Sequence, residues 1–307
     1  MSGPTPNSSR LLVLAAALCF ATTGTAQELG PDGVEPVAVG AARIAVGGAL
    51  LALFAWWSNR RRPSWKRARE MPRATLAAIA VAVAVYQLSF FAAVHLTGVA
   101  VGTVVALGSA PAFAGLAGRL VGDGPLGPRW ALSTALACAG VSLLVIAGAG
   151  ATTIDPVGIG LALVSGSGYA TYTVASKRLL SDGHAPEQVM ACGFGAAALL
   201  LSPVLILAGG AELATPQGLS LALYLGLVPT ALAYILFARG LKRITAGETA
   251  TLTLAEPLTA AALGVLVLGE QPGALAGLGA AITLAGLVVL AVRTPAWPRR
   301  LAPAPVR

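Results

Sequence analysis

Ten stretches of about 20 mostly apolar residues follow one another along this chain, and they limit its fold more than any other feature. A helix needs about 20 residues to cross the hydrocarbon of a bilayer. The stretches are continuously apolar rather than alternating, which argues against the strands of a membrane barrel. We therefore expect an all-α integral membrane protein whose ten transmembrane helices cover residues 11–27, 34–57, 74–96, 99–121, 126–147, 156–176, 185–208, 217–239, 246–268 and 273–292.

Charged residues make up only 10% of the 307 residues, whereas a soluble domain carries about 25%. The net charge of +8 would suggest nucleic acid in a soluble protein. Here the basic residues gather in short loops beside apolar runs, where they set orientation in the membrane. Cys19, Cys138 and Cys192 lie inside apolar runs without metal-ligand spacing. We expect the lipid bilayer as the surroundings, with no nucleic acid, metal or cofactor.

Basic residues occur in every second connection. Lys and Arg are found before span one, after spans two, four, six and eight, and after span ten. Cytoplasmic loops carry the excess of Lys and Arg, so the pattern predicts a multi-pass protein of the cell membrane with both termini in the cytoplasm. The intervening connections contain no Lys or Arg, and their acidic residues are Glu28, Asp32, Asp155, Glu212 and Glu270.

The first apolar stretch has a second interpretation. Arg10, the run Leu11–Phe20 and the small residues Gly24-Thr25-Ala26 also fit a signal peptide with a cleavage site. No soluble domain follows, and the internal repeat needs this segment as a helix.

The second half of the chain repeats the first. With an offset of 146 residues, Phe91-Ala92 aligns with Phe237-Ala238, and Ala139-Gly140 aligns with Ala285-Gly286. Each half contains five spans, an odd number, so the two copies must cross the membrane in opposite directions. Inverted repeats of this kind are typical of secondary transporters. The expected parts are an amino-terminal tail (1–10), two five-helix repeats around a central cavity (11–147 and 156–292), and a carboxyl-terminal tail (293–307).

The pattern resembles the EamA-type drug/metabolite transporter family. The residues that carry the resemblance are Arg43 in span two, Ala110-Pro111 and Gly122-Asp123 in the first half, and Glu256-Pro257 and Gly269-Glu270 in the second. The resemblance implies ten helices around a cavity lined mainly by spans one, three, four, six, eight and nine. Members of this family mostly export amino acids, metabolites or toxic compounds, and some import.

Two charged residues lie deep inside the predicted spans. Glu256 lies roughly 15 Å into span nine, and Arg43 lies roughly 12 Å from the outer end of span two. A charged group at such depth is costly, which makes each residue a candidate for substrate binding or charge coupling. The alternatives are a Glu256 that braces the helix at Pro257 and an Arg43 that makes a structural contact or reaches the membrane surface.

Other cavity candidates are polar residues at mid-span and two prolines. Pro111 and Pro257 lack an amide hydrogen and free the carbonyls of Leu107 and Thr253, which a broken helix can offer to a substrate. The alternatives are a packing kink for the prolines and interhelical hydrogen bonds for the polar side chains. The cavity candidates are Thr22, Thr23, Tyr86, Gln87, Pro111, Tyr169, Tyr172, Tyr234, Glu256 and Pro257.

These features favour a secondary transporter that exports a small amino-acid-like, amphipathic or toxic compound by alternating access. Proton or exchange coupling is a hypothesis that depends on Glu256. A passive channel or a non-transporting membrane scaffold is the alternative, and an integral-membrane enzyme would need a cluster of catalytic residues that the sequence does not display. The sequence does not define the oligomeric state.

Overall fold

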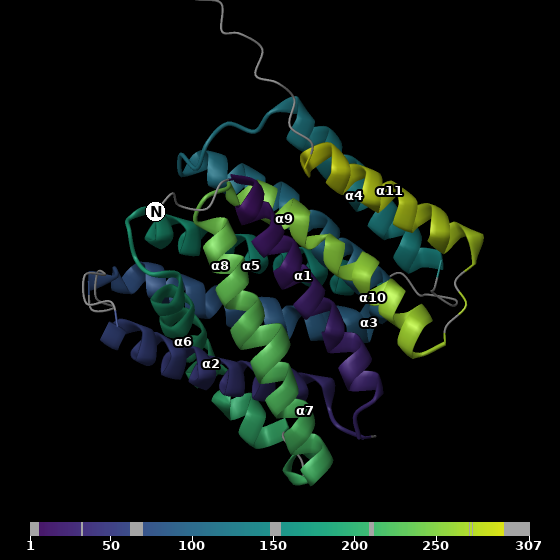
Figure 1. Ribbon diagram of the computed structural model, residues 1–307. Helices are drawn as coiled ribbons and strands as arrows, with labels where there is room; N and C mark the ends of the chain where they lie inside the picture. Colours follow the sequence, from purple (N-terminus) through teal and green to yellow (C-terminus); the bar gives the residue numbers. More distant parts are fainter. Residues whose placement is uncertain are drawn as a thin grey trace, which may run out of the picture.

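The structure, a computed structural model, describes residues 6–31, 33–61, 70–147, 155–208, 212–269, 271 and 273–291. Regular secondary structure in these ranges is helical, and the helices pack side by side in one bundle (Figure 1). The elements are α1 (Pro6–Glu28), α2 (Pro36–Arg61), α3 (Arg73–Leu120), α4 (Pro128–Ala147), α5 (Pro156–Ser181), α6 (Pro186–Ala208), η2 (Glu212–Ala214), α7 (Pro216–Gly226), η3 (Leu227–Leu232), α8 (Ala233–Leu241), α9 (Ala246–Thr253), α10 (Ala255–Val267) and α11 (Ala274–Ala291).

The helices confirm the expected membrane fold. Within the described ranges, nine segments are long and apolar enough to cross a bilayer, and α5, with 26 residues, is the tenth helix of the bundle. Large apolar side chains face outward, where lipid can cover them: Leu199, Ile206, Leu207 and Leu266 are 75–86% exposed. Asp32 and Glu270, most of the basic loop after α2 and the carboxyl-terminal tail lie outside the described residues.

Spans three and four are joined without a loop. The segment α3 consists of two helices that meet at Gly98, whose φ of 78° and ψ of 159° are not helical and are rarely adopted by residues with a Cβ. The chain doubles back at Gly98, as the contact between Gly102 and Val94 indicates: a Cβ on Gly102 would lie 3.0 Å from the Val94 side chain. Gly98 thus forms the turn between two adjacent spans.

The helix interruptions differ from those expected at the prolines. Within α3, Gly98 rather than Pro111 has non-helical dihedral angles, so the expected break at Pro111 is absent. Span nine is interrupted at Leu254, three residues before Pro257. A third irregularity is the π-helical turn η3, which contains Pro229. Pro229 cannot donate to the carbonyl of Leu225, which instead accepts a 2.7 Å hydrogen bond from the Thr230 hydroxyl.

The packing of α4 on α11 confirms the inverted repeat. A Cβ on Gly140 would meet the backbone of Thr283 and Gly279, and a Cβ on Gly286 would meet that of Ala137 and Ser133. These contacts exchange into one another under the 146-residue offset, as a two-fold axis requires. As residue numbers rise along α4 they fall along α11, so these counterpart helices, side by side in Figure 1, are antiparallel.

The counterparts α2 and α6 pack in the same way. A Cβ on Gly48 would contact Phe194 and Gly195, while Asn59, eleven residues further along α2, accepts a hydrogen bond from Gln188 near the start of α6. The two helices are therefore antiparallel. The start of α1 and the end of α11 lie at the same end of the bundle, because Arg10 donates to the carbonyl of Ala291.

Replacing Gly140 by alanine is expected to destabilise the fold. The added methyl group would overlap backbone atoms of α11, which cannot move aside as a side chain can. Overpacking of this kind costs about 1–3 kcal/mol. Thermal unfolding in detergent should show a lower midpoint for Gly140→Ala, whereas Gly277→Ala on α11, with open space around its Cβ, should unfold like the parent. Equal midpoints would contradict the close α4–α11 contact.

Candidate functional site

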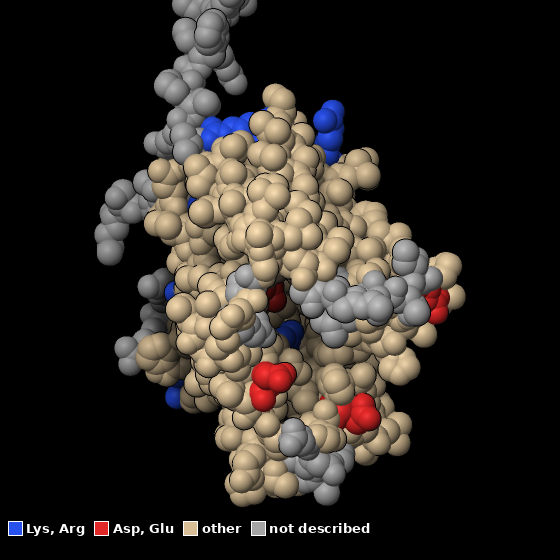
Figure 2. All heavy atoms as spheres, turned by 90° about the vertical axis from the view of Figure 1, so that its right-hand side faces the viewer, with Lys and Arg blue, Asp and Glu red and all other residues tan. Residues whose placement is uncertain are grey.

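A cavity of about 550 Å³ lies between the two repeats. Its walls come from α1 (residues 20–27), α2 (39–43), α3 (86–107), α4 (144–145) and α10 (256–261), together with Leu225 of α7. Spans two and five are therefore added to the set that the family resemblance implies, whereas span six, which is α5, does not line this cavity and contributes only Tyr169 to a neighbouring pocket. The lining segments lie in the halves of these helices that adjoin Glu28, Glu35, Gly98 and Ala147. Figure 2 shows a hollow on this side, with one acidic and one basic group in its depth.

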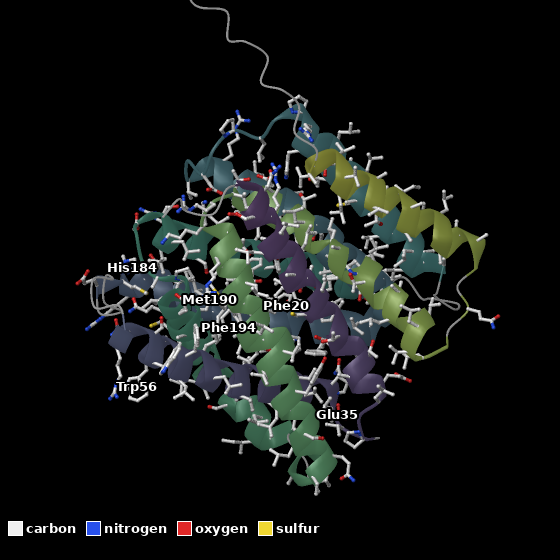
Figure 3. All side chains as sticks on the ribbon, viewed as in Figure 1. Phe20, Glu35, Trp56, His184, Met190 and Phe194 are labelled. Atoms are coloured by element: carbon white, nitrogen blue, oxygen red, sulfur yellow. The ribbon has the colours of Figure 1, made fainter. Side chains whose placement is uncertain are left out.

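The cavity narrows toward the bundle centre into a pocket of about 40 Å³. Ala110 and Glu256, counterparts under the repeat, both line this pocket. Four of the pocket's lining residues belong to a cluster of rings with centroids 4.0–6.5 Å apart. Figure 3 shows two members of this cluster, Phe20 and Phe194, in the middle of the bundle. We call this cluster the aromatic floor; it consists of Phe20, Tyr86, Tyr169, Tyr172, Phe194, Tyr234 and Phe237.

Arg43 and Glu256 line both the cavity and the pocket. The Nε atom of Arg43 is buried and has no hydrogen-bond partner among the described residues. The ion pairs found within the described ranges involve other residues, so the two charges are not joined directly. A buried guanidinium with an open donor can bind an added carboxylate, and a carboxylate at this depth can bind an added cation.

The structure brings most of the predicted site residues together. Thr23, Arg43, Tyr86, Gln87, Glu256 and Pro257 line the cavity, and Tyr169 and Tyr234 line the pocket. Thr22 lies instead on a separate hollow of about 660 Å³ between α1, α7 and α10, and its hydroxyl donates to the carbonyl of Cys19. Pro111 and Tyr172 are buried and line neither the cavity nor the pocket, and Tyr172 is part of the aromatic floor.

Several lining residues are absent from the predicted set. Phe20 and Gln27 lie one turn on either side of Thr23 on α1, and Phe90 lies one turn after Tyr86. Helical spacing of three or four residues from a predicted residue could have identified all three. Thr253 was foreseen only for its carbonyl, yet its side chain lines the pocket and bonds the Tyr169 hydroxyl at 3.0 Å.

Known proteins share this architecture. The model of the EamA-like transporter family matches residues 7–146 and 156–292, one match for each repeat. A solved structure titled "Crystal structure of protein" superposes with a TM-score of 0.79 at 22% identity, covering 92% of this chain and 96% of its own, which supports the fold.

Three curated relatives are transporters by name. The uncharacterized transporter YwfM of Bacillus subtilis is 40% identical and covers 92% of this chain and 94% of its own length. The probable terminal-alkyne amino-acid exporter of Streptantibioticus cattleyicolor is 29% identical, with 90% of each chain covered. The threonine/homoserine exporter RhtA of Escherichia coli is 34% identical over 52% of this chain and 54% of its own. The chain belongs to the EamA-like transporter family.

Proposed function

We propose that this protein is a secondary transporter that exports a small amino-acid-like zwitterion by alternating access. The observation that carries the proposal is the cavity wall, where Arg43 and Glu256 lie unpaired with each other beside aromatic and amide side chains. The carboxylate of a zwitterion can bind Arg43 and its amine can bind Glu256, while aromatic rings of the cavity contact its apolar part. Two relatives named as amino-acid exporters support this substrate class.

The proposed mechanism uses the inverted repeats. The cavity lies at the interface of the repeats and opens toward one end of the bundle, and rocking of one repeat against the other would expose it at the opposite end. We propose that the end carrying Arg10 and Arg61 is cytoplasmic, because basic residues gather there. An Arg61→Cys side chain would then react with an impermeant reagent only from the cytoplasmic side; reaction from outside would reverse the orientation.

Coupling would depend on Glu256. Export needs a driving force. A mid-membrane carboxylate can bind either a proton or a substrate cation, but it cannot bind both at the same time. Competition at one group couples the two movements. We therefore propose proton or substrate exchange as the energy source.

A passive channel is the second candidate, and the aromatic floor argues against it. Tyr172, Phe194 and Phe237 line neither the pocket nor the cavity, and their side chains are fully buried. A pore would need a continuous wet path.

Three compounds of matched shape test the substrate class. In proteoliposomes, the three compounds compete against uptake of a labelled amino acid. Leucine should inhibit this uptake at least about tenfold more strongly than isopentylamine, which lacks the carboxylate. It should also inhibit at least about tenfold more strongly than 4-methylpentanoate, which lacks the amine. The reason is that each analogue leaves one buried charge without a partner, at a cost of about 2 kcal/mol or more. Equal competition by all three compounds would exclude zwitterion recognition, and other amino acids extend the series to the preferred side chain.

A further inference from the structure

The helix ends opposite the cavity mouth carry a set of ion pairs. On α1, α5 and α8, the residues of the aromatic floor lie between the cavity end of the bundle and this end. Here Lys177 lies 3.6 Å from Asp123, and Arg10 lies 2.6 Å from Glu248. With the repeats taken as the family match gives them (7–146 and 156–292), both pairs join the first repeat to the second, whereas the 2.6 Å pair of Arg239 with Glu187 lies within the second repeat.

Lys177 is held mainly by its own repeat. Its ammonium donates to the carbonyl of Leu241, the last residue of α8, at 2.9 Å and to that of Ile244, in the connection to α9, at 2.8 Å. Asp123, three residues after the end of α3, is the partner from the first repeat. If the repeats separate here, Lys177 loses Asp123 but keeps its carbonyl partners, so its charge remains solvated and the contact can re-form.

Asp123 is also bound to the first turn of α9. Its second carboxylate oxygen accepts a 2.6 Å hydrogen bond from the amide of Ala246, the first residue of that helix. A carboxylate is favoured there by the free amides and the helix dipole. Because α9 leads through Leu254 to α10 and Glu256, this contact connects the closed end directly to the helix that carries the cavity carboxylate.

We propose that Asp123 and Lys177, supported by Arg10 and Glu248, form the gate that closes the cavity at this end of the bundle. Opening the gate separates Asp123 from Lys177 and from α9 while the Lys177 carbonyl contacts persist. The inference rests on the proposed alternating access and adds the residues that hold one of its two states. Removing either charge of the main pair therefore shifts the protein toward the state that is open at this end.

A buried cysteine reports the state of the gate without any substrate. Ala250 is 1% exposed, lies one turn after Ala246 and lines the inner pocket, between the gate and the cavity. In a chain with Cys19, Cys138 and Cys192 replaced by alanine, Ala250→Cys is labelled with an impermeant maleimide added at the gate end. We expect Asp123→Asn and Lys177→Met each to raise the labelling rate about tenfold, as when a minor state of about 1% becomes about 10% populated.

Controls separate gating from misfolding. Arg239→Gln breaks a pair within one repeat and should leave the labelling rate unchanged. A Gln27→Cys reporter at the cavity mouth, labelled from the opposite end, shows whether each variant is folded. If labelling of Ala250→Cys stays at the parent rate in folded Asp123→Asn and Lys177→Met, the proposal is overturned. If neither variant folds, labelling of Ala250→Cys is measured in Glu248→Gln instead, and a rate equal to that of the parent overturns the proposal.

The labelling result is independent of the transported compound. If the gate opens in these variants but the protein transports no amino acid, the proposed function is refuted and the proposed gate stands. Amino-acid flux with an unresponsive Ala250→Cys would refute the gate alone.

Discussion

A Glu256→Gln variant should lose transport by at least about 30-fold while folding and expressing like the parent. Glutamine has the size of glutamate but no negative charge, so the substrate amine loses its partner in the cavity. Leaving one member of a buried charge pair unpaired costs about 2 kcal/mol or more, which is a factor of ~30. The measurement is initial uptake into proteoliposomes as a function of substrate concentration and pH.

Glu35→Gln is the matched control for Glu256. Glu35 lies at the edge of the bundle just before α2, is exposed and does not line the cavity (Figure 3). The same chemical change there should leave uptake unaltered. Parent-like transport with an unchanged pH profile in Glu256→Gln would remove Glu256 from the mechanism and leave it the role of bracing the break between α9 and α10.

An Arg43→Gln variant should change which compounds are carried. The KM for an amino acid is expected to rise at least about tenfold, because the carboxylate loses its charged donor. The decarboxylated amine has no group for Arg43 and should be carried at least as well as by the parent. Arg43→Lys keeps the charge but not the planar fork of donors, so it should fall between the parent and Arg43→Gln.

Stability separates this role of Arg43 from a structural one. A buried guanidinium with an open donor contributes little to folding, so Arg43→Gln should unfold in detergent at or above the parent temperature. The exposed Arg73→Gln serves as the control for the loss of one positive charge. A large drop in the unfolding temperature, with amino acid and amine affected equally, would show that Arg43 braces the helices.

The helix positions could be predicted because the bilayer fixes them. Each span needs about 20 apolar residues, and an apolar run such as 274–291 admits little choice of boundary. Helix interruptions depend on neighbours as well as sequence. Pro111 lies in a continuous helical segment, whereas Pro229 lies in a π-helical turn whose free carbonyl is satisfied by Thr230.

The polar part of the candidate site could be predicted because charges such as Glu256 are conspicuous in apolar helices. The apolar part could not, because Phe20 and Phe90 look like any lipid-facing or core residue in a chain that is 56% hydrophobic. Depth alone also misplaced some candidates. Tyr172 and Thr22 lie at the depth in the membrane that was expected for the cavity. The Tyr172 side chain, however, packs in the aromatic floor, and Thr22 lines a separate hollow.

The account depends on one cavity that is exposed alternately at the two ends of the bundle. Counterflow tests this claim most directly: proteoliposomes are loaded with unlabelled amino acid, and entry of a trace of the labelled compound is followed. The account predicts a transient accumulation of label above equilibrium that saturates with concentration and requires the internal load. Linear, unsaturated entry that is the same with and without the load would contradict it.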